Sequence, residues 1–577
     1  MKILPLAVAA LLLASDLLIA QSPAAAQENE AAYALFSAAD YKGAAAAYEG
    51  IISGYPTDVV VQTAQIQLAL CRFYLGEFDG ALAALDKLQS GPPLAGESAA
   101  LVDSLRPQIL AAKAMSLPPG DAARKGIFDQ AIKGYTDFIS KHPRSPELES
   151  AAYGRALCEF QIGEYGKAVT GLRENISKFG NSGTIDSSKN LLAIALATQG
   201  GEALSKDGGD KTAGLALLQE AEGILRGIIG DKKDLALVND AHFQLGEILA
   251  MRAAHTPEAE RQPIYDEAAA AYMAVLPKEQ ILAMQQAKVD SFAGRKRAAL
   301  AARDIALKKK LDQENERELR KLAEIGGKPD QTAPALLKLG EILFNSGKYN
   351  ASRVVLNHAT PFLASPDEKM RALYHRAMGY AVQGAAEPAV KDYNQFQSEH
   401  KGKPIAENLP FLIGNMFLSQ GDSESAIRYF DESLQIYPQG RLAGLSVAQK
   451  AQAQTALKQY DEALRTFTDC LANNPSPEVG VVAQSGIANI HRDTANWDAA
   501  IAAYQETISK YPGTPQAADA PYWIAVCTQQ KGDNAAAADQ LAKFISENPG
   551  NALVPLATFA LGNAQIATGK KDEGLAT

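Results

Sequence analysis

The chain has 577 residues, with 66 acidic and 56 basic side chains and a net charge of −10 at neutral pH. Neutralising nucleic-acid phosphates requires a basic face, so this balance argues against nucleic acid as a general partner. With 47% hydrophobic residues and a mean hydropathy of −0.14, the composition is typical of a soluble protein, and no transmembrane span is predicted beyond the first residues.

Residues 1–26 have the pattern of a secretory signal peptide. Met1-Lys2 precedes an apolar run, Ile3–Ala14, and Ala24 and Ala26 supply the small residues of a cleavage site after Ala26. Asp16 interrupts the apolar stretch, which argues against an uncleaved membrane anchor. The first cysteine after the run is Cys71, too far along the chain for a lipid-attachment site, so lipid attachment is not predicted. The sequence therefore indicates an exported protein.

Residues 27–277 are predicted to form an N-terminal array of helical hairpins. A motif of Tyr41, Ala44, Tyr48 and Pro56 recurs 37 residues later as Phe78, Ala81, Leu85 and Pro93. The next step is 50 residues, which places roughly 13 inserted residues around Pro92–Pro107, and two further units follow at 128–143 and 165–172. Residues 181–277 are less regular and hold one degenerate unit and one marked by Leu245, Gly246, Ala268 and Tyr272.

Residues 278–331 break the repeat and predict a charged connector built on one long helix. Between Arg295 and Lys321 there are ten basic and five acidic residues, a local net charge of +5. The favoured interpretation is a solvated helix with charges paired four residues apart. The alternative is a basic ridge, which predicts a weak contact of residues 295–321 with an anionic surface or an acidic partner. Poor heptad spacing argues against a coiled-coil dimer.

Residues 332–577 predict a C-terminal array, because a repeat of 37 residues runs through seven successive blocks and stops early in the last one. Two columns are small in every block, twelve residues apart, and a third column four residues later is large and apolar. This spacing predicts two antiparallel helices, A and B, whose backbones approach closely and interlock through one large side chain. The helix A small column is Gly340, Ala377, Gly414, Ala451, Ala488, Ala525 and Gly562; the helix B small column is Ser352, Ala389, Ala426, Ala463, Ala500, Ala537 and Gly574; the knob column is Leu356, Tyr393, Phe430, Phe467, Tyr504 and Leu541.

These columns resemble the tetratricopeptide repeat family, as does a proline after helix B at Pro438, Pro475, Pro512 and Pro549. The resemblance implies an all-α, right-handed superhelical solenoid of about 12–13 helix-turn-helix units. The usual family unit has about 34 residues. The longer unit here, with junctions such as Tyr511-Pro512-Gly513, is similar to repeats of bacterial periplasmic proteins. Examples are the lipoprotein that helps insert outer-membrane β-barrels and the Tol-Pal-associated coordinator of envelope constriction. This similarity of the repeat unit implies a periplasmic or outer-membrane-associated location in a bacterium, with secretion as the alternative.

No catalytic or metal-binding motif is recognisable in the sequence. It lacks the phosphate-binding loop, His-Glu-x-x-His, Cys-x-x-Cys and Gly-x-Ser-x-Gly patterns. His375 and His491 stand alone near the helix A face, where a structural role is favoured. The four cysteines fall at core positions of separate repeats, too far apart for a disulfide. We therefore expect no enzymatic activity, metal or cofactor.

Two further columns of helix A predict a partner-binding surface on a concave inner wall. The aromatic column contains Tyr374, Phe411, Tyr522 and Phe559, and the amide column contains Met378, Asn415, Gln452, Asn489 and Asn563. Amides can donate to and accept from a peptide backbone, and aromatics offer apolar contact area, so the pair suits an extended peptide. The alternative is that the aromatics fill the seam between repeats. The aromatic column has no lysine, so the carboxylate clamp of chaperone-binding family members is not implied.

The sequence thus predicts an exported scaffold or adaptor that binds proteins or extended peptides in the bacterial cell envelope. Two alternatives remain open. The repeats could be the targeting arm of a larger envelope enzyme whose catalytic domain lies beyond Thr577, or a structural subunit of an export or adhesion complex. The identity of the partner and the oligomeric state are not encoded in any recognisable motif.

Overall fold

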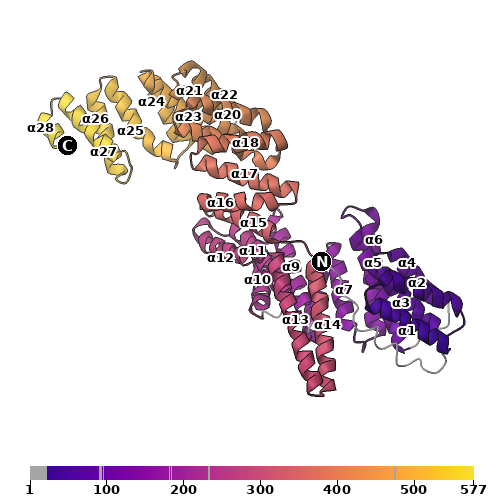
Figure 1. The fold of residues 1–577 in the computed structure, drawn as a ribbon. Coiled ribbons are helices and arrows are strands. Elements are labelled where there is room, and N and C mark those ends of the chain that lie inside the picture. Colours follow the sequence, from indigo (N-terminus) through magenta and orange to yellow (C-terminus); the bar gives the residue numbers. More distant parts are fainter. Residues whose placement is uncertain are drawn as a thin grey trace. The chain divides into compact units, whose positions relative to one another are not determined.

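The computed structural model describes residues 22–89, 94, 96–180, 182, 185–231, 234–473 and 476–577. Within these ranges the chain is helical, with no strand, and the expected all-α repeat solenoid is confirmed. It divides into two compact units, Met1–Thr332 and Ala333–Thr577 (Figure 1). Most of the predicted signal peptide, residues 1–21, lies outside the described residues.

The first unit contains six helical hairpins followed by a longer one. From α1 to α12 each helix packs against the next along the chain, and the first helices of most successive hairpins also touch, as α9 and α11 do. Its helices are α1 (Pro23–Ser37), α2 (Tyr41–Gly54), α3 (Val60–Tyr74), α4 (Phe78–Gln89), α5 (Gly96–Ser116), α6 (Ala122–Lys141), α7 (Leu148–Gln161), α8 (Tyr165–Phe179), α9 (Ile185–Ser205), α10 (Lys211–Asp231), α11 (Leu235–Ala254), the 3-10 turn η1 (Glu258–Glu260), α12 (Arg261–Met273), α13 (Lys278–Ala301) and α14 (Ile305–Gly327).

The second unit contains seven hairpins in the register that the columns predict. Its helices are α15 (Thr332–Asn345), α16 (Tyr349–Ala359), η2 (Thr360–Phe362), α17 (Pro366–Val382), α18 (Ala386–His400), η3 (Pro404–Ala406), α19 (Asn408–Ser419), α20 (Ser423–Ile436), α21 (Ala443–Ala456), α22 (Tyr460–Ala472), α23 (Pro477–Asp493), α24 (Trp497–Lys510), α25 (Pro515–Gln530), α26 (Asn534–Glu547), α27 (Val554–Ala567) and α28 (Lys571–Ala576).

The small columns mark the closest approach of the two helices in a hairpin. A Cβ added to Gly340 would lie 2.5 Å from Leu356, and one added to Gly414 would lie 2.7 Å from Phe430. In these two hairpins the large side chain of the knob column therefore occupies the space that a missing side chain leaves on helix A. The hydroxyl of Ser352 donates a hydrogen bond of 2.7 Å to the carbonyl of Gly340, which only a close backbone approach permits.

The turn between helices A and B also repeats with the 37-residue period. One residue in each turn has a left-handed backbone, with φ between 59° and 97°. Its amide and the next amide bond back to the end of helix A, as in Gly421 N to Leu418 O (3.1 Å) and Asp422 N to Phe417 O (3.0 Å). The left-handed residues are Gly347, Gly384, Gly421, Lys458, Ala495, Gly532 and Gly569.

The insertion placed around Pro92–Pro107 coincides with longer helices on its C-terminal side, whereas Pro92 itself lies outside the described residues. α5 and α6 have 21 and 20 residues, compared with 15 and 12 in α3 and α4. Pro107 lies inside α5 and is buried. A Cβ added to Gly134 of α6 would lie 3.1 Å from the Pro107 ring, so the proline is packed where its neighbour has no side chain.

The prediction of one long helix in residues 278–331 is wrong. The chain reverses at Ala302–Asp304 and forms an antiparallel hairpin of α13 and α14 that belongs to the first unit. Arg303 adopts the left-handed backbone with φ 56°, and the Asp304 side chain accepts from Leu307 N at 2.8 Å. This is the turn of the repeats themselves, made without glycine.

Overpacking the helix contact should destabilise the array. Ala500 is fully buried in the helix B small column, so Ala500→Leu is expected to cost about 1–3 kcal/mol. Ala502 lies exposed on the same helix, α24, and Ala502→Leu should change little. Urea denaturation and hydrogen exchange of α23 and α24 measure the difference. Equal stability of the two variants would contradict the register.

Candidate functional site

The aromatic column is mostly part of the core. Tyr374 of α17 and Tyr522 of α25 are buried, and their rings contact Phe396 (6.5 Å between centroids) and Phe544 (6.0 Å) on helix B of the same hairpin. Burial raises the pKa of both tyrosine hydroxyls. For these two residues the structure places the side chain in the seam and not on a binding surface.

The other two aromatics of this column differ in exposure. Phe411 of α19 is half-buried, with its ring 6.0 Å from that of Phe430. Phe559 of α27 is 71% exposed, and it shares its helix with Leu556 and Ile566, which are also exposed. The column therefore changes from core to surface along the array, and Phe411 and Phe559 are the members that a partner could reach.

The amide column is the more accessible of the two. Met378 is buried, but Asn415 and Gln452 are half-buried and Asn563 is exposed. Within the described ranges the Asn415 and Gln452 side chains make no hydrogen bond to the chain. Their polar atoms are not sealed in the interior either, because neither is among the buried atoms that lack a partner. The structure thus brings two unengaged amides to equivalent places on α19 and α21.

Asn489, the third amide, belongs to a polar cluster on α23–α25 that we call the Arg492 cluster. The Tyr504 hydroxyl donates to Asn489 Oδ1 at 2.6 Å and accepts from Arg492 Nη1 at 3.2 Å. The guanidinium of Arg492 lies 4.1 Å above the Trp523 ring and also binds Asp493 at 2.9 Å. Burial raises the pKa of Tyr504 above its usual range, so the hydroxyl stays protonated as a donor.

Sequence reasoning missed a second polar cluster, formed where α15 meets α17. Arg371 Nη2 donates to Glu341 Oε2 at 2.5 Å, and His375 Nδ1 lies 2.9 Å from the carbonyl oxygen of Arg371. Burial lowers the pKa of His375, which favours the neutral ring. His375 is therefore a half-buried neighbour of an ion pair, which agrees with the structural role that its isolation in the sequence favoured. The signal for the pair was the acid Glu341, which stands 37 residues before Met378 of the amide column, with a base 30 residues after it.

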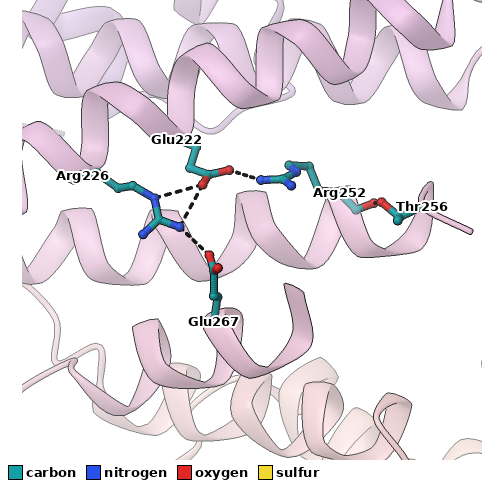
Figure 2. A network of polar contacts seen from close by, with 5 residues as sticks. All are labelled: Glu222, Arg226, Arg252, Thr256 and Glu267. Atoms are coloured by element: carbon teal, nitrogen blue, oxygen red, sulfur yellow. Dashed lines mark hydrogen bonds and ion pairs between the residues drawn. The ribbon is translucent and has the colours of Figure 1, made fainter. Parts of the chain in front are cut away.

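A third polar network ties three helices of the first unit together. Figure 2 shows Arg226 of α10 between the carboxylates of Glu222 and Glu267, with Arg252 of α11 binding Glu222 from the other side. Arg226 Nη2 lies 2.9 Å from Glu222 and 2.5 Å from Glu267 of α12. Since the charges neutralise one another, this network stabilises the packing of α10, α11 and α12 and offers no unpaired group to a ligand.

The described residues show no arrangement typical of catalysis or metal binding. No group of three or more His, Cys, Asp or Glu side chains among them is placed to hold a metal ion. All four cysteines are buried free thiols, and burial raises the pKa of Cys71 to about 12. A shallow surface cavity of about 730 Å³ lies beside α20, lined by residues such as Ile427 and Asp431, not by the amide column. Across the described ranges, no helix is both long and apolar enough to cross a bilayer.

Repeated helical hairpins with small contact columns and a proline-terminated helix B define a class of protein-interaction solenoids. Residues 411–439 and 486–552 match family models of the tetratricopeptide repeat. These two segments of the second unit are therefore tetratricopeptide repeats, and the recognition of this repeat class is confirmed. Such repeats are typically non-catalytic scaffolds for binding proteins.

Several solved structures match the chain at low TM-scores. The crystal structure of the APC/C Cut9–Hcn1 hetero-tetramer matches with 13% identity and a TM-score of 0.31, covering 96% of this chain and 98% of the other. A tetratricopeptide repeat protein from Parabacteroides merdae matches with 17% identity and a TM-score of 0.29, covering 48% and 98%. PilW, a type IV pilus biogenesis factor, matches with 16% identity and a TM-score of 0.31, covering 40% and 99%. No curated protein matches the chain. These TM-scores are too low to indicate a function for this chain.

Removing the hydroxyl at the centre of the Arg492 cluster should destabilise the second unit. Tyr504→Phe leaves the half-buried Asn489 and Arg492 without their shared partner, at a cost of about 1–3 kcal/mol in the free energy of unfolding. Tyr48 of α2 provides the control, because its buried hydroxyl has no hydrogen-bond partner among the described residues. Tyr48→Phe should leave the urea midpoint unchanged or raise it. A similar loss in both variants would show that the cluster contributes nothing.

Proposed function

We propose that this chain is a non-catalytic, exported scaffold of the bacterial cell envelope that binds an extended segment of a partner protein. The binding surface is the amide column, with Asn415 and Gln452 at its centre and Asn489 and the Arg492 cluster beside it. The observation that supports this proposal is the pair of unengaged amides at the same place in consecutive repeats.

The chemistry of the amide column suits a peptide backbone. An extended segment presents alternating N–H and C=O groups, and a side-chain amide can satisfy either. Because Asn415, Gln452 and Asn489 follow one another at 37-residue steps on equivalent helices, the column offers contacts at regular intervals along a bound segment. Phe411 and Phe559 add apolar area next to the amides, whereas Tyr374 and Tyr522 support the wall from within the core.

The envelope location rests on the signal-peptide pattern and on the similarity of the 37-residue unit to periplasmic repeats. In the structure, α1 begins at Pro23, and Ser22 caps it while its amide donates to Asp58 at 3.0 Å. Cleavage after Ala26 would remove this cap and the first turn and leave Gln27–Ser37 as the helix. A weak contact of residues 295–321 with an anionic surface belongs to the same proposal.

Loss of the two free amides should weaken peptide binding with no loss of fold. Peptides selected on the wild-type protein from a displayed library provide the probe, and calorimetry measures their Kd. Asn415→Ala with Gln452→Ala should raise the Kd about thirtyfold, because two hydrogen bonds contribute roughly 1 kcal/mol each. Gln505→Ala, on the exposed side of α24, is the control and should bind as the wild type does. If the double variant keeps the wild-type Kd, the partner uses another surface.

Export predicts a defined N-terminus. Protein recovered from the envelope fraction of a bacterial host should begin at Gln27, because Ala24 and Ala26 fit the small-residue rule of signal peptidase. Intact-mass measurement identifies the first residue. Finding Met1 on that material would show that the segment is not cleaved.

A further inference from the structure

The α13–α14 hairpin is anchored at its base. Lys321 and Lys328 pair with Asp234 and Asp240 at 3.0 Å each, so the end of α14 is tied to the start of α11. Lys278, the first residue of α13, donates to the carbonyls of Gly326 and Lys328 at 2.7 Å. In Figure 1 the two helices lie side by side, with their turn at the end remote from α11 and α12.

Ion pairs between the two helices use the acidic residues of α14. Lys288 binds Glu318 at 2.8 Å, and Lys296 binds Asp312 at 3.2 Å. Lys308 also binds Asp312, at 2.7 Å. The helix-to-helix pairs add to the pairs four residues apart on α14, such as Arg320 with Glu316 at 3.2 Å. Asp312 is the acidic residue of these pairs that lies nearest the turn between α13 and α14.

The hairpin tip, residues 297–310, is rich in unpaired positive charge. It contains five basic residues and one acid, Asp304, whose carboxylate is engaged in capping α14. Four of the five cations have no carboxylate within ion-pair distance anywhere in the described part of the chain. These are Arg297, Arg303, Lys309 and Lys310, and all four are exposed. The tip therefore carries a net charge of +4 in a protein whose total is −10.

The same tip exposes large aliphatic side chains on both sides of the turn. Leu300 is 50% exposed, Ile305 is 65% exposed and Leu307 is 42% exposed. The small core of the outer hairpin, Phe292, Ala299 and Leu311, does not include them. Three exposed aliphatics next to unpaired cations are an arrangement that neither helix needs for its own stability.

We propose that the hairpin tip docks onto an anionic lipid bilayer, with Leu300, Ile305 and Leu307 entering the interface and the surrounding cations binding head groups. Anionic lipid surfaces attract clustered Lys and Arg, and aliphatic side chains bury in the zone just beneath the head groups. An acidic protein would satisfy the charges and leave the aliphatics exposed, unless it brought an apolar pocket as well. A bilayer offers a protruding turn both anionic head groups and an apolar layer, and it needs no shaped pocket to do so. The proposal gives the weak anionic contact proposed above a defined site and does not depend on the amide column.

The test is flotation of the purified full chain with vesicles of stated composition. Wild-type protein should bind vesicles of phosphatidylglycerol mixed in equal parts with phosphatidylcholine, and should not bind phosphatidylcholine alone. Lys309→Gln with Lys310→Gln should lower the partition coefficient about thirtyfold, since each cation near such a surface contributes roughly a factor of five. Leu300→Gln, Ile305→Gln and Leu307→Gln together should also reduce binding, at high salt most of all, where screening removes the electrostatic part.

The matched control removes the same charge from the same helix nearer its base. Arg317→Gln with Arg320→Gln should bind the mixed vesicles nearly as the wild type does, and far-ultraviolet circular dichroism should show every variant equally helical. Equal losses in the two double variants would overturn the proposal, because binding would then follow total charge. Wild-type binding by the aliphatic variant, or no binding by the wild type at low ionic strength, would also overturn it and favour an acidic protein. Neither result would alter the peptide affinity of the amide column, so the two proposals fail separately.

Discussion

The contact on which the rest of the structure depends is the close approach of helices A and B at the two small columns. Gly340 leaves a space that Leu356 fills, and Gly414 leaves one that Phe430 fills. Nearly every other member of these columns is alanine or glycine, and the one hydroxyl, on Ser352, bonds across the interface to a backbone carbonyl. A larger side chain on either helix would separate them, since protein interiors have no free volume to absorb it. The 37-residue register follows from repeating this contact.

This register determines which side chains remain available for binding. Helix A must present one stripe to helix B and another to the next repeat, and both stripes are apolar. The aromatic column faces the seam between the helices, where large side chains fill the space, so Tyr374 and Tyr522 are buried. The amide column lies one turn further along the helix, where Met378 is buried but Asn415 and Gln452 are half-buried and keep their hydrogen-bonding capacity. The polar face is thus the part of helix A that packing does not use.

Much of the fold could be predicted from the sequence, because the small columns, the proline ends and the period are local and repeated. The reversal in residues 278–331 was missed because its turn has Arg303 where most other turns have glycine, although Ala39, Lys458 and Ala495 form the same turn without glycine. The burial of the aromatic column could not be predicted either. This burial depends on large helix B side chains such as Phe396 and Phe544, which contact the aromatic column only in the folded structure. The pair of Glu341 with Arg371 crosses two repeats and has no sequence motif.

The amide column and the hairpin tip would recognise partners through forces of different range. Neutral amides act only at hydrogen-bond distance and carry no net charge, so ionic strength has little influence on them. The unpaired cations of the tip act over roughly a Debye length, about 8 Å at physiological salt, and are weakened by added salt. A chain with net charge −10 is repelled by an anionic surface overall, so only a segment in which acids are already paired, as Asp312 and Glu318 are, can approach one. Because the acids along the hairpin are already paired, the tip keeps its positive charge although the whole protein is negatively charged.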